Sequence, residues 1–234
     1  MKVLASILLY LFSVGVYADK NKIIALVTFV NGEAYYQEES KMENLKVHTL
    51  LQPGSSVFTK KGQLRIQLGK NSILHLPSYS KLSLEYSGTE EKFDITLLLK
   101  EGALYTRILK DLEKKSNFKV LTKTYVAGVR GTEFLIQDYP SSVGAEKNGV
   151  FVHSGKVEIR DASSDIVRDT LQAGEELIQD KDKMVKKLLD DYMVEKLRIF
   201  EELKVMKEKT YELLKEQKLK NLSIYKSSKE KMKK

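Results

Sequence analysis

The chain has 234 residues, of which 42% are hydrophobic, so it can form one medium-sized domain with a buried core and an additional segment. It contains no cysteine, which excludes disulfides, thiol nucleophiles and thiolate metal sites. The formal charge of +8 lies almost entirely in residues 181–234, where 17 lysine and arginine residues accompany 10 carboxylates. The basic character therefore belongs to the C-terminal tail and not to the body of the chain.

Residues 1–18 have the layout of a secretory signal peptide. Lys2 supplies the positive charge, residues 3–12 form an apolar run too short to span a membrane, and Val16-Tyr17-Ala18 has the pattern of a cleavage site. An uncleaved membrane anchor is the alternative. We expect an exported chain that begins near Asp19, resides in the periplasm or cell envelope, and has no transmembrane anchor after cleavage.

Residues 19–180 are predicted to form one β domain. Short runs alternate apolar and polar residues from about residue 23 to residue 178, and glycine-containing turns separate them at intervals typical of all-β folds. Asn31-Gly32 is the strongest hairpin signal in the chain. Turns are expected at Gly32, Gly54, Gly102, Gly155 and Gly174. The predicted fold is mainly β, either a twisted β sandwich or a solenoid-like roll.

The most distinctive stretch of this domain is Val129-Arg130-Gly131-Thr132-Glu133-Phe134. It continues an alternating strand through a centre that holds Gly128, Arg130 and Gly131, and glycine permits a bend or a close approach of two backbones. One interpretation is a strand–bulge–strand corner in which Val129, Arg130, Gly131, Thr132 and Phe134 are structural. The other is a ligand-binding site that uses the Arg130 guanidinium.

The order of these motifs resembles the FecR domain family. The resemblance extends over about residues 25–178 and rests on the segments 27–34, 50–59, 63–72, 98–105, 129–134, 150–159 and 171–174. It implies a non-catalytic, β-rich module outside the cytoplasmic membrane. In the regulators that gave the family its name, this module passes iron-siderophore signals to a sigma factor through a membrane helix and a cytoplasmic segment. Because the β region here follows the expected signal peptide directly, only the extracytoplasmic binding module is expected to carry over.

Residues 181–234 are predicted to form a long, basic, amphipathic helix with a frayed end, which can act as a coiled coil. This stretch has no glycine or proline. An apolar stripe follows three- and four-residue steps through Val185, Leu189, Met193, Leu197, Phe200, Leu203 and Met206. Such a stripe needs a partner face, either on its own β domain or on a second copy of the chain.

Enzymatic function is not supported by the sequence. No Ser-His pair, phosphate-binding glycine loop or His-x-x-x-His motif occurs, and His48, His75 and His153 lie far apart. We therefore expect no catalytic residues, no metal site and no cofactor. Nucleic-acid binding is also not expected, because export separates the chain from the genome and glutamates interrupt the basic tail.

These observations predict a non-catalytic protein that acts as a binding or scaffolding module of the envelope. In one version the β domain binds an envelope protein or glycan, and the helix forms a homo-oligomer or docks the domain. In the other, the lysine-rich tail contacts an anionic surface. The alternative function is a component of a cell-surface signalling or iron-uptake sensing system that acts through a separate membrane partner.

Overall fold

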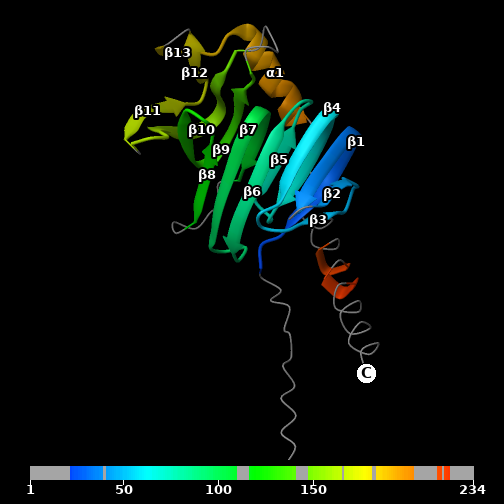
Figure 1. Cartoon of the computed structure of the whole chain (residues 1–234). Coiled ribbons are helices and arrows are strands. Elements are labelled where there is room, and N and C mark those ends of the chain that lie inside the picture. Colours follow the sequence, from blue (N-terminus) through cyan, green and yellow to red (C-terminus); the bar gives the residue numbers. More distant parts are fainter. Residues whose placement is uncertain are drawn as a thin grey trace, which may run out of the picture.

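The computed structural model describes residues 22–38, 41–109, 116–140, 147–164, 166–180, 183–202, 215–217 and 219–221. In this part of the chain thirteen strands are followed by one helix of 12 residues and by short helical stretches at 215–217 and 219–221 (Figure 1). The strands are β1 (Ala25–Glu38), β2 (Lys41–Asn44), β3 (Leu50–Leu51), β4 (Ser56–Leu68), β5 (Ser72–Leu76), β6 (Lys81–Gly88), β7 (Phe93–Ile108), β8 (Asn117–Leu121), β9 (Tyr125–Asp138), β10 (Gly149–Asp161), β11 (Val167–Gln172), β12 (Glu175–Asp180) and β13 (Lys183–Leu188), and the helix is α1 (Asp191–Glu202). The prediction of a mainly β fold is confirmed.

All thirteen strands belong to one sheet that folds over into two layers, because five long strands contribute one half to each layer. The first layer joins, in order, β2, the second half of β1, the first half of β4, β6, the first half of β7, β8, the first half of β9, the second half of β10, and β11. The second layer joins β3, the first half of β1, the second half of β4, β5, the second halves of β7 and β9, the first half of β10, β12 and β13. All of these pairings are antiparallel except that of β7 with β8.

Each of the five long strands contains a glycine near the point where it changes layer. These glycines are Gly32 in β1, Gly62 in β4, Gly102 in β7, Gly131 in β9 and Gly155 in β10. The predicted hairpin at Asn31-Gly32 is therefore wrong, because β1 continues through it with a register shift. Gly102 and Gly155, which were also expected in turns between strands, likewise lie inside strands, whereas Gly54 and Gly174 lie in turns.

The main core lies between the two layers. Alternate residues of each strand face inward, for example Leu64, Ile66 and Leu68 of β4 and Ile95 and Leu97 of β7, and all five are at most 1% exposed. The period of two that predicted the strands thus also places the core.

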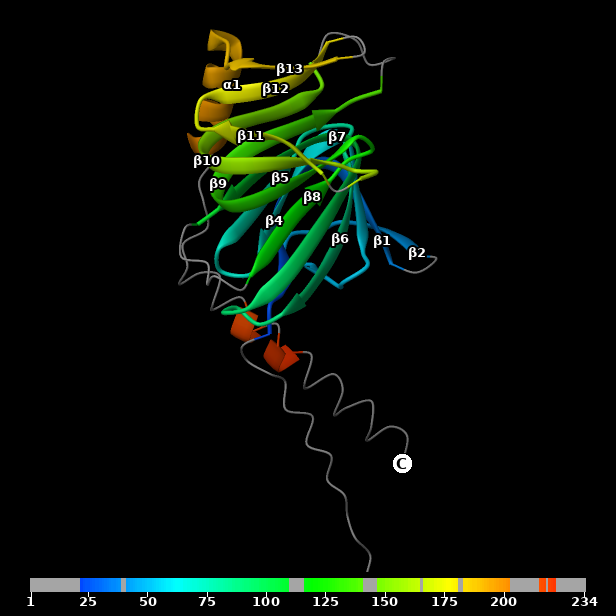
Figure 2. The ribbon, with the colours of Figure 1, turned by 90° about the vertical axis from the view of Figure 1, so that its left-hand side faces the viewer.

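Helix α1 packs on the outer face of the second layer. Met193 and Leu197 of α1 pack on Tyr105, Leu135 and Phe151 of the sheet, and all five side chains are buried. The second view shows α1 lying along one side of the sheet, next to β12 (Figure 2). The expected coiled-coil stripe is thus used, in this region, to bind the helix to its own β domain.

The prediction of one long helix from about residue 182 is wrong. Residues 183–188 form β13, which pairs along its whole length with β12, and α1 begins only at Asp191. Val185 shares a helical spacing with Leu189, but it lies opposite Ile178 in the sheet. The expected signal peptide and the segments 203–214 and 222–234 lie outside the described residues. Among the helices that are described, none is both long and apolar enough to cross a membrane.

Candidate functional site

The distinctive motif lies where β9 crosses from the first layer to the second, beside β10. Gly131 has a φ of 59° and Gly155 a φ of 82°, and the β9–β10 register shifts on both sides of Ser154. A Cβ atom on Gly155 would lie 2.5 Å from the carbonyl oxygen of Gly131 and 3.0 Å from Cα of Thr132. The two backbones are therefore closer than any side chain at residue 155 would permit.

The other motif residues surround this bend in different ways. The buried hydroxyl of Thr132 donates a hydrogen bond to the carbonyl oxygen of Lys156 (3.0 Å), which links the two strands at the bend. Phe134 is fully buried in the main core, and Val129 packs against it. The backbone of Arg130 pairs with Lys156, but its side chain is outside the described part of the structure. The role of its guanidinium therefore stays a prediction.

Glu133, the motif residue that the sequence did not single out, lies on the outer face of the second layer. Its carboxylate forms an ion pair with Arg107 (Nε to Oε1, 2.7 Å) and accepts a hydrogen bond from the hydroxyl of Tyr105 (3.4 Å). Arg107 is directly opposite Glu133 in the sheet, and both side chains are mostly buried, so the pair is better shielded than a surface ion pair. A pairing between residues 26 apart has no local sequence signal, which is why the sequence could not identify it.

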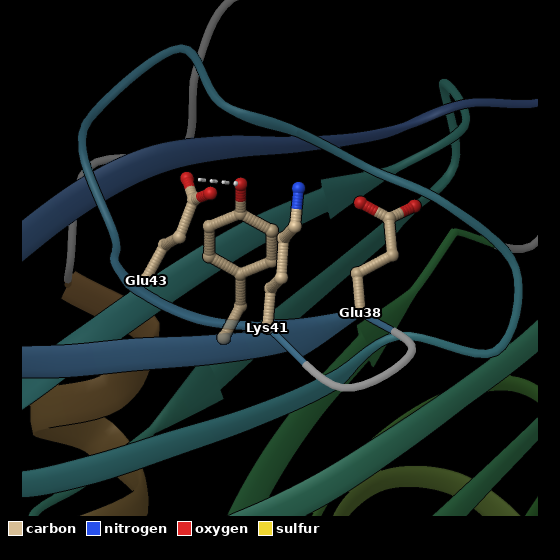
Figure 3. A pocket seen from close by; sticks show the side chains of 4 residues that line it. Glu38, Lys41 and Glu43 are labelled. Atoms are coloured by element: carbon tan, nitrogen blue, oxygen red, sulfur yellow. Dashed lines mark hydrogen bonds between the residues drawn. The ribbon is translucent and has the colours of Figure 1, made fainter.

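A second feature is a polar hollow over the β1–β2 hairpin. It has a volume of about 340 Å³ and is lined by Tyr36, Glu38, Lys41 and Glu43, and the last three side chains lie along one face of the hairpin (Figure 3). The Tyr36 hydroxyl donates to Glu43 (3.1 Å); burial raises the pKa of Tyr36, and this hydrogen bond raises it further. A neighbouring hollow of about 440 Å³ adds Met42, Asn44, Lys46 and Thr49 to Tyr36 and Glu43.

Strand β2, which contributes to the lining of both hollows, is the last strand of its layer within the described chain. The amide of Leu45 donates a hydrogen bond to the carbonyl of Ala34, the residue directly opposite it. In an antiparallel pair, every second residue directs both its N–H and its C=O at the neighbouring strand, and the residues between them direct these groups away from it. By this alternation Glu43 and Lys41 face β1, while Met42 directs its N–H and C=O at the open edge. Met42 is 62% exposed. Such an edge can accept an extended segment of another protein.

The histidines do not form a site. Burial and then the charge of Arg65 lower the pKa of His75 to about 4, so this side chain is neutral at pH 7 inside the sheet. In the residues that the structure describes, no group of three or more histidine, aspartate or glutamate side chains is placed to hold a metal ion. Burial raises the pKa of Tyr125 and that of Asp138 at the two ends of β9. Tyr125 is buried in the core and Asp138 is half-buried at the end of the strand, so burial alone explains both raised pKa values without a catalytic role.

The fold and the motif bend define a class of protein: an all-β module of two layers whose strands cross between the layers at glycines. Comparison with protein families identifies it further. Residues 55–163 match the model of the family described as FecR protein. The resemblance expected from the order of the motifs is confirmed, and the matched stretch contains both the motif bend and the Arg107–Glu133 pair.

Solved structures provide a weaker comparison. A crystal structure described as a candidate anti-sigma factor from Parabacteroides distasonis ATCC 8503 has a TM-score of 0.46 and 20% identity, over 59% of this chain and 61% of that chain. A second crystal structure with the same description has a TM-score of 0.44 and 19% identity over the same shares. The chain thus spans about three fifths of the length of these proteins. No curated protein matches the chain significantly.

Proposed function

We propose that this protein is a regulator-type component of a cell-surface signalling system and acts by binding a separate protein. The observation that carries the proposal is the FecR match over residues 55–163, which includes the motif bend at Gly131. The proposal takes up the signalling alternative of the sequence analysis. A binding or scaffolding role in the envelope, with a glycan or an anionic surface as partner, stays a prediction.

The described surface favours a protein partner over a small molecule. Both hollows at the β1–β2 hairpin are lined mostly by polar side chains, and the main core is filled by hydrophobic residues. Small-molecule sites are usually mostly apolar and enclosed. In contrast, the edge at Met42 offers backbone groups to an extended segment, with polar side chains on the Glu43 face that can fix its register.

The test uses deletion of the gene in its source organism, followed by measurement of transcripts. If the protein is a regulator, the levels of a defined set of transcripts should change on deletion and return to their original values when the full chain is restored. The deletion strain is also complemented with the Met42→Pro variant. Proline at residue 42 has no N–H to direct at the open edge, whereas Glu43 and Lys41 keep their backbone hydrogen bonds to β1. Met42→Ala is the matched control, because it removes the same side chain and keeps the N–H.

We expect Met42→Ala to restore the transcripts and Met42→Pro to fail. If deletion changes no transcripts under conditions in which the protein is made, the regulatory function is refuted. If deletion does change them but Met42→Pro restores them as well as the full chain does, the regulatory function stands and the partner binds elsewhere.

A further inference from the structure

Lys215, in a short helical stretch near the end of the described chain, contacts the β domain at the turn between β6 and β7. In this turn the amide of Thr89 donates to the carbonyl of Lys92, and the amide of Lys92 donates back to the hydroxyl of Thr89. Glu90 lies at its tip. Its carboxylate accepts Nζ of Lys215 at 2.9 Å, across 125 residues of sequence. The contact thus joins a fixed turn of the sheet to a helical turn near the end of the chain.

Both charged groups of this ion pair are largely removed from water. The side chain of Lys215 is 4% exposed and that of Glu90 is 10% exposed. A buried ammonium is costly unless a carboxylate accompanies it, and a buried carboxylate needs donors for both oxygens. The second oxygen of Glu90 accepts the backbone N–H of Lys70 at 2.8 Å, so both oxygens are bound.

The adjacent turn between β4 and β5 is shaped to leave room for this carboxylate. Gly69 has a φ of 61°, and a Cβ at this position would lie 2.9 Å from Oε2 of Glu90 and 3.1 Å from the side chain of Ile23. A side chain at residue 69 would therefore push Glu90 away from the Lys70 amide. The Glu90 carboxylate that accepts the lysine is therefore held in place by backbone atoms of the β4–β5 turn and not only by its own rotamer.

The start of the described chain reaches the same turn. Lys22 forms an isolated bridge with Thr89, and the amide of Ile23 donates to the carbonyl of Gly88 at 3.2 Å. The two views agree that the first described residues and residues 215–221 lie at the same end of the β structure (Figures 1 and 2). The β6–β7 turn therefore holds both ends of the described chain.

We infer that the corner formed by Glu90, Gly69 and the Lys70 amide is a receiving site for a lysine side chain, filled by Lys215 of the same chain. This contact is a latch: it fixes residues 215–221 beside the point at which the chain enters the β domain. Release of the lysine frees the C-terminal segment without breaking any strand pairing, because the latch residues lie in turns and in a short helical stretch.

The latch can be tested in the full chain with spin labels, because the absence of native cysteine makes two introduced cysteines the only labelling sites. Lys92→Cys in the turn and Asn221→Cys in the C-terminal segment place the labels at exposed positions on the two sides of the contact. Pulsed electron paramagnetic resonance then gives the distribution of distances between them. Glu90→Gln and Lys215→Gln each remove one charge of the latch, while Glu91→Gln and Glu216→Gln remove exposed neighbouring charges as matched controls.

We expect one narrow distance peak in the parent and in both controls. In Glu90→Gln and in Lys215→Gln the ratio of the docked to the undocked population should fall at least tenfold, since each change leaves one charge of a buried pair alone. The distance distribution of the double variant Glu90→Gln/Lys215→Gln should be no broader than that of the more strongly affected single variant, because both changes remove the same interaction. Circular dichroism should show an unchanged β signal in all of them.

A narrow peak that persists in both single latch variants would show that other contacts hold the segment, and a broad distribution in the parent would show that no latch exists. A second measurement needs no labels: limited trypsin digestion after Lys220 should be faster in Lys215→Gln than in Glu216→Gln. Equal digestion rates would overturn the inference.

Discussion

Gly155→Ala tests whether the fold depends on the close approach of β9 and β10, and Gly174→Ala provides a matched control. Both glycines have a φ of 82°, so alanine meets the same backbone strain at each. They differ in their surroundings. A Cβ at residue 155 would lie 2.5 Å from the Gly131 carbonyl oxygen and 3.0 Å from Thr132 Cα, whereas nothing lies within 4 Å of a Cβ at residue 174. The contacts at residue 155 are backbone atoms, which cannot rotate away.

The left-handed backbone costs alanine about 1–2 kcal/mol at either position. At residue 155 the strands must also separate, which adds about 1–3 kcal/mol by analogy with overpacked cores. Separation further weakens the hydrogen bond from Thr132 to the Lys156 carbonyl, which is worth about 1 kcal/mol. We therefore expect the free energy of unfolding to fall by about 1–2 kcal/mol in Gly174→Ala and by about 2–6 kcal/mol in Gly155→Ala.

Urea denaturation followed by circular dichroism measures both free energies of unfolding. The two values can be compared if the free energy of unfolding has the same dependence on urea concentration in both variants. The reasoning is refuted if the two variants lose the same free energy within error, because the close approach at the motif would then contribute nothing beyond the backbone conformation.

Two further predictions concern protonation and export. The pKa of His75 is lowered to about 4 in the folded chain, so the neutral form is favoured there; the resulting stability is complete above the unfolded pKa of about 6.5 and is lost as the pH falls towards 4. Urea titrations of the parent and of His75→Leu at several pH values measure this effect. The free energy of unfolding should fall between pH 6.5 and pH 4 by up to about 3 kcal/mol less in His75→Leu than in the parent, and identical pH profiles for the two proteins would contradict the prediction. For export, mass spectrometry of the native protein should find an N-terminus within a residue or two of Asp19, and an intact Met1 would refute the signal peptide.

The sequence predicted the strands better than their connections, for a physical reason. Alternation of apolar and polar residues reports which face of a strand is buried, and that property is local. A glycine with a positive φ serves equally well in a turn or in a bulge. Gly32 and Gly54 therefore look alike in sequence, yet the first lies within β1 and the second in a turn, because strands distant in sequence decide where the chain continues.

The same limit applies to the site. The motif from Val129 to Phe134 could be recognised from its own residues and their order, and the family match confirms that recognition. The ion pairs of Glu133 with Arg107 and of Glu90 with Lys215 could not be found this way, since each joins residues that only the folded sheet brings together. Individually, all four residues look like ordinary surface charges.

The C-terminal segment shows how a correct local pattern led to a wrong element, and it changes what truncation should do. The sequence predicted a complete β domain in residues 19–180, which implies that a chain ending at Gln179 stays folded. In the structure such a chain lacks β13, whose Lys187 pairs with the fully buried Glu176, and lacks α1, which buries Met193 and Leu197. Burial of these two side chains contributes about 1.5–3 kcal/mol each, so a chain that ends at Leu188 should lose about 3–6 kcal/mol relative to one that ends at Glu202.

The chain that ends at Gln179 should lose still more, because the buried Glu176 would lose its Lys187 partner and an additional strand edge would open. A small domain has a total stability of about 5–15 kcal/mol, so this chain should be partly or wholly unfolded at 25 °C, with the chain ending at Leu188 between the two others. Thermal melting of the three chains by far-ultraviolet circular dichroism measures the order. If the chain ending at Gln179 melts at the same temperature as the one ending at Glu202, β13 and α1 are an appendage to an independent β domain, and the second layer is stable with its outer face open to water.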